Sequence, residues 1–227
     1  LRSLAANAGM ADLLLVDLNT GEIVYSTKKR IDLGTNVYAG AYAESGLGEV
    51  VEKLTTVAVG DSVISDTYFY VPTSGEPVFF LASAVRLDAD VVGAVITEVP
   101  VSALTGVMTA QQDWRRLGLG DTGEAYIVGA DKTLRTETRA WLEDPDGYLK
   151  RHLKQYNAPE TTELIEIVGS PVLIQQVDND AVTEGLDGNP FIGNVTSYLG
   201  TKTLTASGPA AVDGVNWAVV VEIDRSE

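Results

Sequence analysis

Hydrophobic residues recur along this chain in two spacings, and the order of the two spacings is repeated. In the first half, short β-branched and aliphatic runs predict strands, and one stretch between them has apolar residues at the 0, 3, 4 and 7 positions of a helix face. The predicted strands are residues 13–17, 22–26, 62–71, 78–86 and 91–100. The helix face consists of Leu47, Val50, Val51 and Leu54. An Asn-Thr-Gly turn at residues 19–21 favours a hairpin between the first two strands.

The second half opens with the glycine-rich sequence GLGDTGEAYIVGADKTLRTETR, residues 118–139. It predicts a buried strand at 125–128, a tight turn at 129–131 and then a second strand, because glycine and aspartate both favour turns. Helical spacing follows at 141–156, past Pro145. The apolar face of that helix consists of Leu149, His152, Leu153 and Tyr156. The later elements predicted are a strand at 171–177, a polar and partly helical link at 179–188, and strands at 195–199, 201–207 and 215–223.

Each half closes with a similar β-branched run. Residues 91–100 read VVGAVITEVP and residues 215–224 read VNWAVVVEID, so each run ends in a glutamate followed by an aliphatic residue. Glu98 and Glu222 are 222 − 98 = 124 positions apart. Two copies at this spacing indicate two modules of one fold rather than a short solenoid repeat.

The predicted fold class is therefore α+β, with two tandem modules that each contain a central antiparallel sheet flanked by helices. We place the first module at residues 1–105, a connecting helix or linker at 106–117, and the second module at 118–227. Residues 101–116 have a helical pattern that begins after Pro100, a residue tolerated in the first turn of a helix. Residues 1–9 are interpreted as the stub of an N-terminal helix.

Composition narrows the range of partners. The 227 residues carry a formal net charge of −16, with a sequence pI near 4.3, which argues against binding to nucleic acid or to an anionic membrane surface. The chain has no cysteine and therefore no disulfide and no thiol chemistry. No run reaches the roughly 18 apolar residues that span a bilayer, and no signal peptide is visible after Leu1.

Catalytic and metal motifs are weak in this sequence. Gly118, Gly120 and Gly123 satisfy the G-x-G-x-x-G pattern, but a helix-like segment precedes them and a strand follows, which is the reverse of a dinucleotide site. His152 is the only histidine and is interpreted as an interface residue on its helix, and there is no G-x-S-x-G motif. The acidic pairs at 144–146 and 178–180 lack the spacing of a calcium loop. We expect no enzymatic activity, no cofactor and no metal site.

The glycine-rich sequence at 118–139 resembles the entry hairpin of the membrane-proximal module in double Cache domains, which are tandem PAS-like extracytoplasmic sensors. It is close to the pattern G-x-T-G-E-x-Y-x-V-G-x-D-x-x-x-R of that family. The first module resembles the same family through DLLLVD at 12–17, GEIVYS at 21–26, DLGTN at 32–36 and SGL at 45–47. These segments are followed by Asp66, by YVPT at 70–73 and by Pro77.

The resemblance implies a function. It identifies the chain as the small-molecule sensing part of a bacterial transmembrane receptor of the cyclase, histidine kinase or chemoreceptor type. The domain would lie on the extracytoplasmic side of the cell membrane, anchored by membrane helices outside this sequence. The first module would be the membrane-distal one and would bind the ligand. Receptors of this kind often act as dimers, so a homodimer is among the expected partners.

In PAS-like modules the pocket lies between the sheet face and the helical segment. Asp66, Tyr68 and Tyr70 alternate along one predicted strand and would share a face, because strand side chains repeat every two residues. Phe80 and Ala82 would do the same on the neighbouring strand. We expect these residues, with Tyr42, to bind a small polar ligand: an amino acid, an amine or a carboxylate.

Arg135 is the candidate ligand residue of the second module. Its guanidinium could hold a carboxylate through two hydrogen bonds, or it could form a structural ion pair with Glu137 or another neighbour. Three other functions stay open at this point. They are a soluble intracellular PAS-like or GAF-like binding module, a hydrolase of unrecognised type, and a spacer without a pocket.

Overall fold

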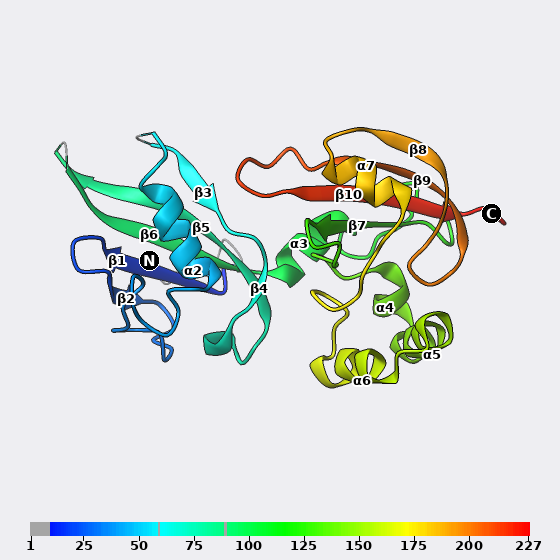
Figure 1. The fold of residues 1–227 in the computed structure, drawn as a ribbon, viewed down its shortest axis with the longest axis horizontal. Helices are drawn as coiled ribbons and strands as arrows, with labels where there is room; N and C mark the ends of the chain where they lie inside the picture. The colour runs from blue at the N-terminus through cyan, green and yellow to red at the C-terminus, as the bar shows by residue number, and fades with distance from the viewer. Residues whose placement is uncertain (1–9, 59, 89) are drawn as a thin grey trace. The chain divides into compact units, whose positions relative to one another are not determined.

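The computed structural model describes residues 10–58, 60–88 and 90–227. It has an α+β fold with two antiparallel sheets, which confirms the predicted fold class (Figure 1). The chain divides into two compact units. The first extends to Val101 and includes Asp213–Val215, and the second contains Ser102–Val212 and Asn216–Glu227. The module limits predicted from the sequence, 1–105 and 118–227, remain predictions, and the predicted N-terminal helix at 1–9 lies outside the described residues.

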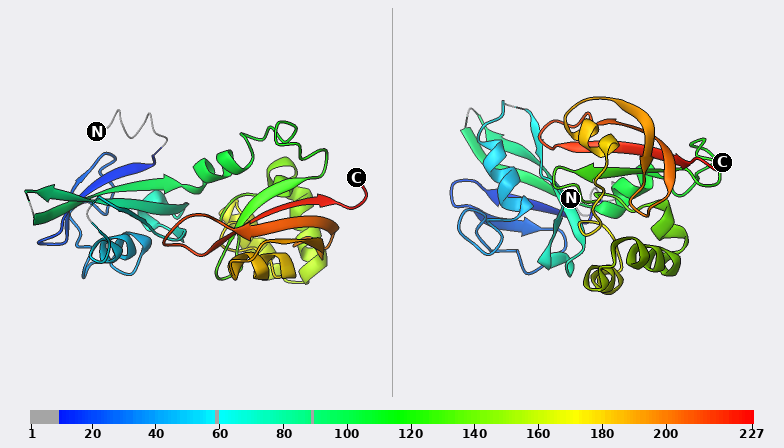
Figure 2. Two further views of the ribbon diagram at one scale, coloured as in Figure 1. Left: turned by 90° about the horizontal axis from the view of Figure 1, so that it is seen from above. Right: turned by 45° about the vertical axis from the view of Figure 1, so that its right-hand side comes forward.

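The first unit is built on a sheet with the strand order β2-β1-β6-β5-β3, in which β4 also pairs with β5. Its strands are β1 (Asp12–Asp17), β2 (Glu22–Ser26), β3 (Ser62–Ile64), β4 (Tyr68–Phe69), β5 (Pro77–Leu87) and β6 (Asp90–Pro100). The helix α2 (Gly46–Leu54) lies against one face of this sheet (Figure 2, left). The apolar face predicted for α2 is buried, and Ser45 caps the helix by accepting a hydrogen bond from the Leu47 amide at 3.2 Å.

The pairing register shows which side chains face α2. Leu14 pairs with Ile96, and Ile96 pairs with Ala82. Side chains directly opposite one another in a sheet share a face, and these three belong to the same buried cluster as the apolar face of α2. The predicted face of Phe80 and Ala82 is therefore the inward one.

The second unit has a sheet with the order β7-β10-β9-β8. Its strands are β7 (Glu124–Gly129), β8 (Phe191–Thr196), β9 (Lys202–Pro209) and β10 (Trp217–Asp224). Its helices are α4 (Arg139–Glu143), α5 (Pro145–Tyr156), α6 (Pro159–Val168) and α7 (Asp180–Leu186), and α3 (Val101–Met108) begins at the boundary with the first unit. α7 packs on β8, β9 and β10. Within the described part of the chain, no helix combines the length and the apolar character needed to cross a membrane.

Four predicted strands differ from the structure. The strand predicted at 195–199 lies instead at Phe191–Thr196, as β8, and residues 197–200 form a turn. The strand predicted at 62–71 is interrupted: the step from Ile64 to Tyr68 covers four residues, whereas their partners Leu81 and Val78 are three apart. The second strand expected after residue 131 and the strand expected at 171–177 are reduced to isolated bridges, which join Val128 to Leu134 and Thr133 to Gln176. Apart from these bridges, both segments form turns with hydrogen bonds of their own, so they do not extend the sheet.

Two helices differ from the sequence expectation. α3 ends at Met108 rather than near residue 116, and Ala110, Gln111 and Gln112 have positive φ angles, which a continuing helix does not allow. α6 was not predicted. It begins at Pro159 and ends at Gly169 in the left-handed conformation, and its one buried apolar residue is Ile165, so it carries little periodic signal. His152 of α5 is buried and bonds Thr162 of α6 at 2.8 Å.

Candidate functional site

The inward face of the first sheet changes from apolar to acidic at one end. Asp12 of β1 pairs with Glu98 of β6, and Glu98 pairs with Phe80 of β5, so the three side chains form one row across the sheet. Asp12 and Glu98 are both fully buried. Burial of two carboxyl groups in one row requires compensating partners, because an isolated buried charge is costly.

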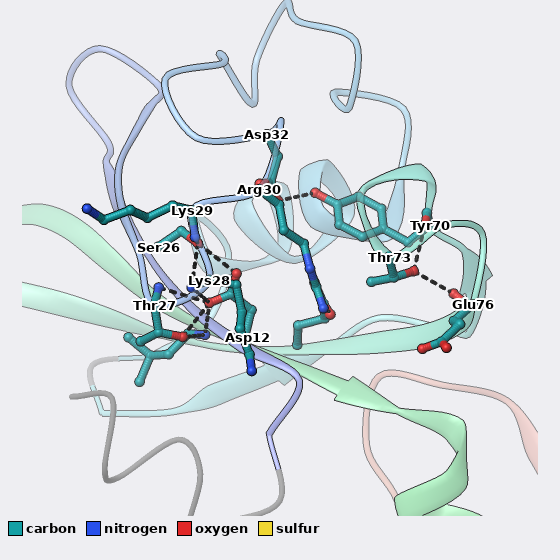
Figure 3. A network of polar contacts seen from close by, with 12 residues as sticks. Asp12, Ser26, Thr27, Lys28, Lys29, Arg30, Asp32, Tyr70, Thr73 and Glu76 are labelled. Carbon is teal, nitrogen blue, oxygen red and sulfur yellow. Dashed lines mark hydrogen bonds and ion pairs between the residues drawn. The ribbon is translucent and has the colours of Figure 1, made fainter.

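Asp12 has a structural role. Its carboxylate accepts hydrogen bonds from the Ser26 hydroxyl at 2.7 Å, the Thr27 amide at 2.9 Å and the Lys28 amide at 3.1 Å (Figure 3). It also accepts from the Leu13 amide at 2.7 Å and from the Thr27 hydroxyl. These bonds fix the chain that leaves β2 and direct the following segment over the end of the sheet.

Glu98 is neutralised by Arg30, which follows that fixed segment. The Arg30 Nη1 atom lies 2.6 Å from Glu98 Oε1. The other oxygen, Oε2, is buried and has no hydrogen-bond partner. Burial raises the pKa of Glu98 to about 7, although Arg30 acts in the opposite direction. Arg30 itself retains a quarter of its side-chain exposure, so the ion pair reaches the surface on the arginine side.

Asp32 brings a third buried carboxyl group to the same place. Tyr70 donates its hydroxyl to Asp32 Oδ2 at 2.9 Å, and Oδ1 is buried without a partner. Figure 3 shows the Asp12 network and the Asp32–Tyr70 pair on either side of the Arg30 side chain. Burial, followed by the Asp32 charge, raises the pKa of Tyr70, so this phenol stays neutral and remains a donor.

Aromatic rings surround this acidic end. The Tyr42 and Tyr70 ring centroids are 5.5 Å apart, and those of Tyr70 and Phe80 are 5.0 Å apart, both in edge-to-face geometry. The distal acidic cluster, defined as Asp12, Arg30, Asp32, Tyr70 and Glu98, thus has three carboxyl groups against one guanidinium. Its two unpartnered oxygens, Asp32 Oδ1 and Glu98 Oε2, can accept hydrogen bonds from a cation, and the rings supply faces on which cations bind favourably.

The structure brings together part of the set predicted from the sequence. Tyr42, Tyr70 and Phe80 contact one another beside Asp32, and Ala82 lies on the same inward face. Tyr68 lies opposite Val78 of that face, but its hydroxyl donates to Glu49 of α2.

Asp66 is not part of a strand, which corrects the expectation of one face for Asp66, Tyr68 and Tyr70. It lies in the irregular segment where the register shifts, is partly buried, and accepts the Thr67 amide at 2.7 Å. Tyr70 comes just after β4 and before a 3₁₀ turn at Val71–Thr73.

Arg135 lies in the second unit and is held by its own turn. Its guanidinium pairs with Asp131 at 3.0 Å and donates to the Thr133 carbonyl at 3.1 Å and to the Thr133 hydroxyl at 2.6 Å. Only 3% of the side chain is exposed. The guanidinium lies directly over Gly129, where a Cβ atom would be 2.2 Å from Arg135 Cζ. This geometry matches the structural alternative, with Asp131 rather than Glu137 as the partner.

Sequence reasoning missed Asp12, Arg30, Asp32 and Glu98. A usable signal was present in part, because Glu98 has the same phase as Ala94 and Ile96, and Asp12 the same phase as Leu14. An ionisable residue in the apolar phase of a strand is a candidate for a buried polar site. Arg30 and Asp32 lie in a loop without periodicity and gave no such signal.

Comparisons with known proteins identify the fold. No protein-family profile and no curated protein sequence matches the chain. Solved structures do match. The ligand-binding domain of the Pseudomonas fluorescens chemoreceptor CtaA, in complex with L-isoleucine, aligns at TM-score 0.56 and 14% identity over 98% of this chain and 72% of its own.

Two further structures are similar to the same extent. The ligand-binding domain of the Pseudomonas aeruginosa amino acid chemoreceptor PctB, in complex with L-Arg, has a TM-score of 0.57 and 12% identity, over 97% of this chain and 74% of its own. The extracellular domain of the putative histidine kinase rpHK1S-Z16 has a TM-score of 0.59 and 14% identity, over 100% of this chain and 76% of its own. The chain therefore has the fold of the ligand-binding domains of these chemoreceptors and of the extracellular domain of this histidine kinase, as the resemblance to double Cache domains predicted.

Proposed function

We propose that this chain is the extracytoplasmic small-molecule sensing domain of a transmembrane signal-transduction receptor, and that its first unit binds an organic amine at the distal acidic cluster. The shared fold supports the sensing role, because two of the similar structures are chemoreceptor ligand-binding domains in complex with L-isoleucine and L-Arg. In this proposal the domain performs no catalysis, and membrane helices outside the sequence anchor it.

The observation that carries the amine assignment is the pair of unpartnered carboxylate oxygens. Asp32 Oδ1 and Glu98 Oε2 are buried and receive no hydrogen bond. An ammonium group has three donors and one positive charge, so it could donate to these carboxylate oxygens and offset part of the negative charge of the cluster. Arg30 is already paired with Glu98 through Nη1, so a ligand carboxylate would have to compete with Glu98 for the charge of this guanidinium.

Binding at this position can be coupled to signalling. Glu98 is on β6, which ends at Pro100 and continues directly into α3 at Val101. Arg30 and Asp32 lie on a loop that a ligand would have to displace, because the carboxyl groups of Asp32 and Glu98 are buried in this structure. A ligand shifts the receptor only if it binds the open and closed arrangements with different affinity.

Isothermal titration calorimetry tests both the ligand class and the site. The probes are a panel of primary amines, amino acids and carboxylates titrated into the intact chain. We expect binding by amines, and we expect Asp32→Asn to weaken it about 10-fold to 150-fold, which corresponds to the loss of one charged hydrogen bond of about 1.5–3 kcal/mol. Asp66→Asn is the matched control and should leave the affinity unchanged.

Two results would contradict the proposal in different ways. If Asp66→Asn abolishes binding and Asp32→Asn does not, the ligand occupies the pocket predicted from the sequence instead. If carboxylates bind and simple amines do not, the amine assignment is wrong.

A further inference from the structure

The second unit contains a pair of buried glutamates that the proposed function does not use. Glu124 of β7 and Glu222 of β10 are directly opposite each other in the antiparallel register. They are 7% and 3% exposed. Within the residues that the structure describes, no ion pair neutralises either carboxyl group. Two like charges directly opposite in a sheet are destabilising, and more so when buried.

The hydrogen bonds distinguish the two carboxyl groups. Glu124 accepts the Tyr198 hydroxyl at 2.7 Å and the Arg139 amide at 2.9 Å, so it is well suited to carry a negative charge. Glu222 accepts one long hydrogen bond, from the Thr203 hydroxyl at 3.5 Å, and it interacts with the Tyr126 hydroxyl and with Glu124 itself. This asymmetry favours an ionised Glu124 beside a protonated Glu222.

Arg139 and Arg151 line the same pocket as the pair, but among the described residues neither forms an ion pair with Glu124 or Glu222. The Arg139 guanidinium bonds Glu143 at 2.9 Å and the carbonyl groups of Gly120 and Gly123. The other titratable or charged groups of the packed elements are Tyr126 on β7, Tyr148 and Arg151 on α5, Tyr198 after β8, Asp224 on β10 and Asp121 in the preceding loop. Burial raises the pKa values of Tyr126, Tyr148 and Tyr198, so these phenols stay neutral.

Burial, with the neighbouring Glu124 charge, raises the pKa of Glu222 to about 8, and burial also raises the pKa of Glu124. The proton can exchange with solvent, because a pocket of about 190 Å³ is lined by both glutamates. The same pocket is lined by charged groups at its rim, among them Asp121, Glu143 and Arg151.

The pair lies next to the contacts that hold the end of β10. The Asp224 amide donates to the Thr122 hydroxyl at 3.1 Å. The Glu227 carboxylate accepts from the Asp121 amide at 3.0 Å and from the Thr122 amide at 2.9 Å. Glu222 is two residues before Asp224, which makes the first of these contacts. Its partner Glu124 is two residues after Thr122, which accepts that contact. A change of charge at Glu222 therefore occurs close to these contacts.

We propose that Glu124 and Glu222 form a proton-binding site that makes the end of β10 responsive to pH. Below the transition one proton is shared by the pair, and β10 stays fully paired with β7. Above it the proton leaves to water, two negative charges oppose each other across the β7–β10 ladder, and the contacts of Asp224 with the 118–123 loop loosen. This site is independent of ligand binding in the first unit.

Carbon-13 NMR of the intact, glutamate-labelled chain tests the proposal between pH 5 and pH 10. We expect the Glu222 carboxyl signal to titrate above pH 7, and the Asp224 amide signal to change with the same midpoint. Glu222→Gln preserves the side-chain volume and should remove both transitions. Glu143→Gln, in the same pocket but paired with Arg139, is the control and should preserve them.

Each outcome decides the question. A Glu222 signal that titrates near the ordinary glutamate pKa, or a transition that survives in Glu222→Gln, overturns the proton site. An Asp224 amide that does not follow the Glu222 titration overturns the coupling to β10. Because the wild-type titration needs no variant, misfolding of Glu222→Gln would not leave the proposal undecided.

Discussion

Replacing Arg30 by methionine tests how the first unit holds a buried glutamate. Methionine keeps an unbranched apolar stem but removes the guanidinium that lies 2.6 Å from Glu98 Oε1. The folded protein keeps the Glu98 proton to about pH 7, whereas the ordinary value is 4.5. Stability from this group is therefore fully present below pH 4.5 and declines as pH rises toward 7.

The magnitude follows from that titration. Below pH 7 Glu98 is mostly protonated with or without Arg30, so the substitution costs about 1–2 kcal/mol for a lost hydrogen bond and some packing. Above pH 7 the wild-type glutamate ionises against Arg30 and stability levels off. In the variant the pKa of Glu98 rises further, and stability continues to fall by up to about 1.4 kcal/mol per pH unit. The difference between variant and wild type should therefore be about 2 kcal/mol larger at pH 8.5 than at pH 6.

The assay is urea unfolding followed by methyl NMR signals of Leu14 and Ile96. Both side chains are buried in the first core, so they report this unit separately from the second. Glu98→Gln and the double variant that combines it with Arg30→Met complete a double-mutant cycle. With glutamine at this position the cost of losing Arg30 should no longer depend on pH. A cost that is the same at pH 6 and pH 8.5 in the presence of Glu98 would refute the reasoning.

Two further predictions concern the same unit. Tyr70→Phe removes the hydroxyl that donates to Asp32 and should destabilise the unit by about 1–3 kcal/mol, because a buried carboxylate loses its donor. Urea unfolding measures this loss. A loss below about 0.5 kcal/mol would show that Asp32 finds another donor. Gly48→Ala places a Cβ atom 1.8 Å from the Ala43 carbonyl oxygen, so it should cost about 1–3 kcal/mol and reduce the melting temperature. Gly208→Ala meets no atom within 4 Å and is the neutral control; equal losses at the two glycines would contradict the steric argument.

The sheet framework was largely predictable because its strands have strong local signals. β2 has the predicted bounds, 22–26, and β1, β6 and β10 lie within one or two residues of prediction. Their runs are β-branched, long enough to be distinctive, and bounded by turn residues. α2 is shorter than its surrounding segment, but its apolar face was read correctly because helical spacing fixes the face directly.

The candidate site was less predictable, for two physical reasons. Strand alternation shows that Phe80 and Ala82 share a face, but it does not show whether that face is inward. For the same reason the burial of Glu98 could not be predicted from alternation alone. The position of Asp32 depends on tertiary hydrogen bonds of its loop, such as the one from the Gly34 amide to the Ile23 carbonyl at 2.9 Å. No periodicity encodes such a loop, so the contact between Asp32 and Tyr70 could come only from the structure.

Each unit contains a buried glutamate whose charge needs a partner, and the two units differ in the partner that they offer. Glu98 and Glu222 occupy corresponding positions near the ends of β6 and β10, and both are buried on a sheet. Glu98 has a guanidinium partner, and the Tyr70 ring lies in the same cluster, so its charge can be balanced by a cation, either Arg30 or, in our proposal, a ligand. Glu222 instead faces another carboxylate and forms no ion pair within the described residues, so in our proposal a proton balances it. Each unit therefore has a buried glutamate near the end of its closing strand, and in our two proposals the partner of that glutamate determines whether the strand end responds to an amine or to pH.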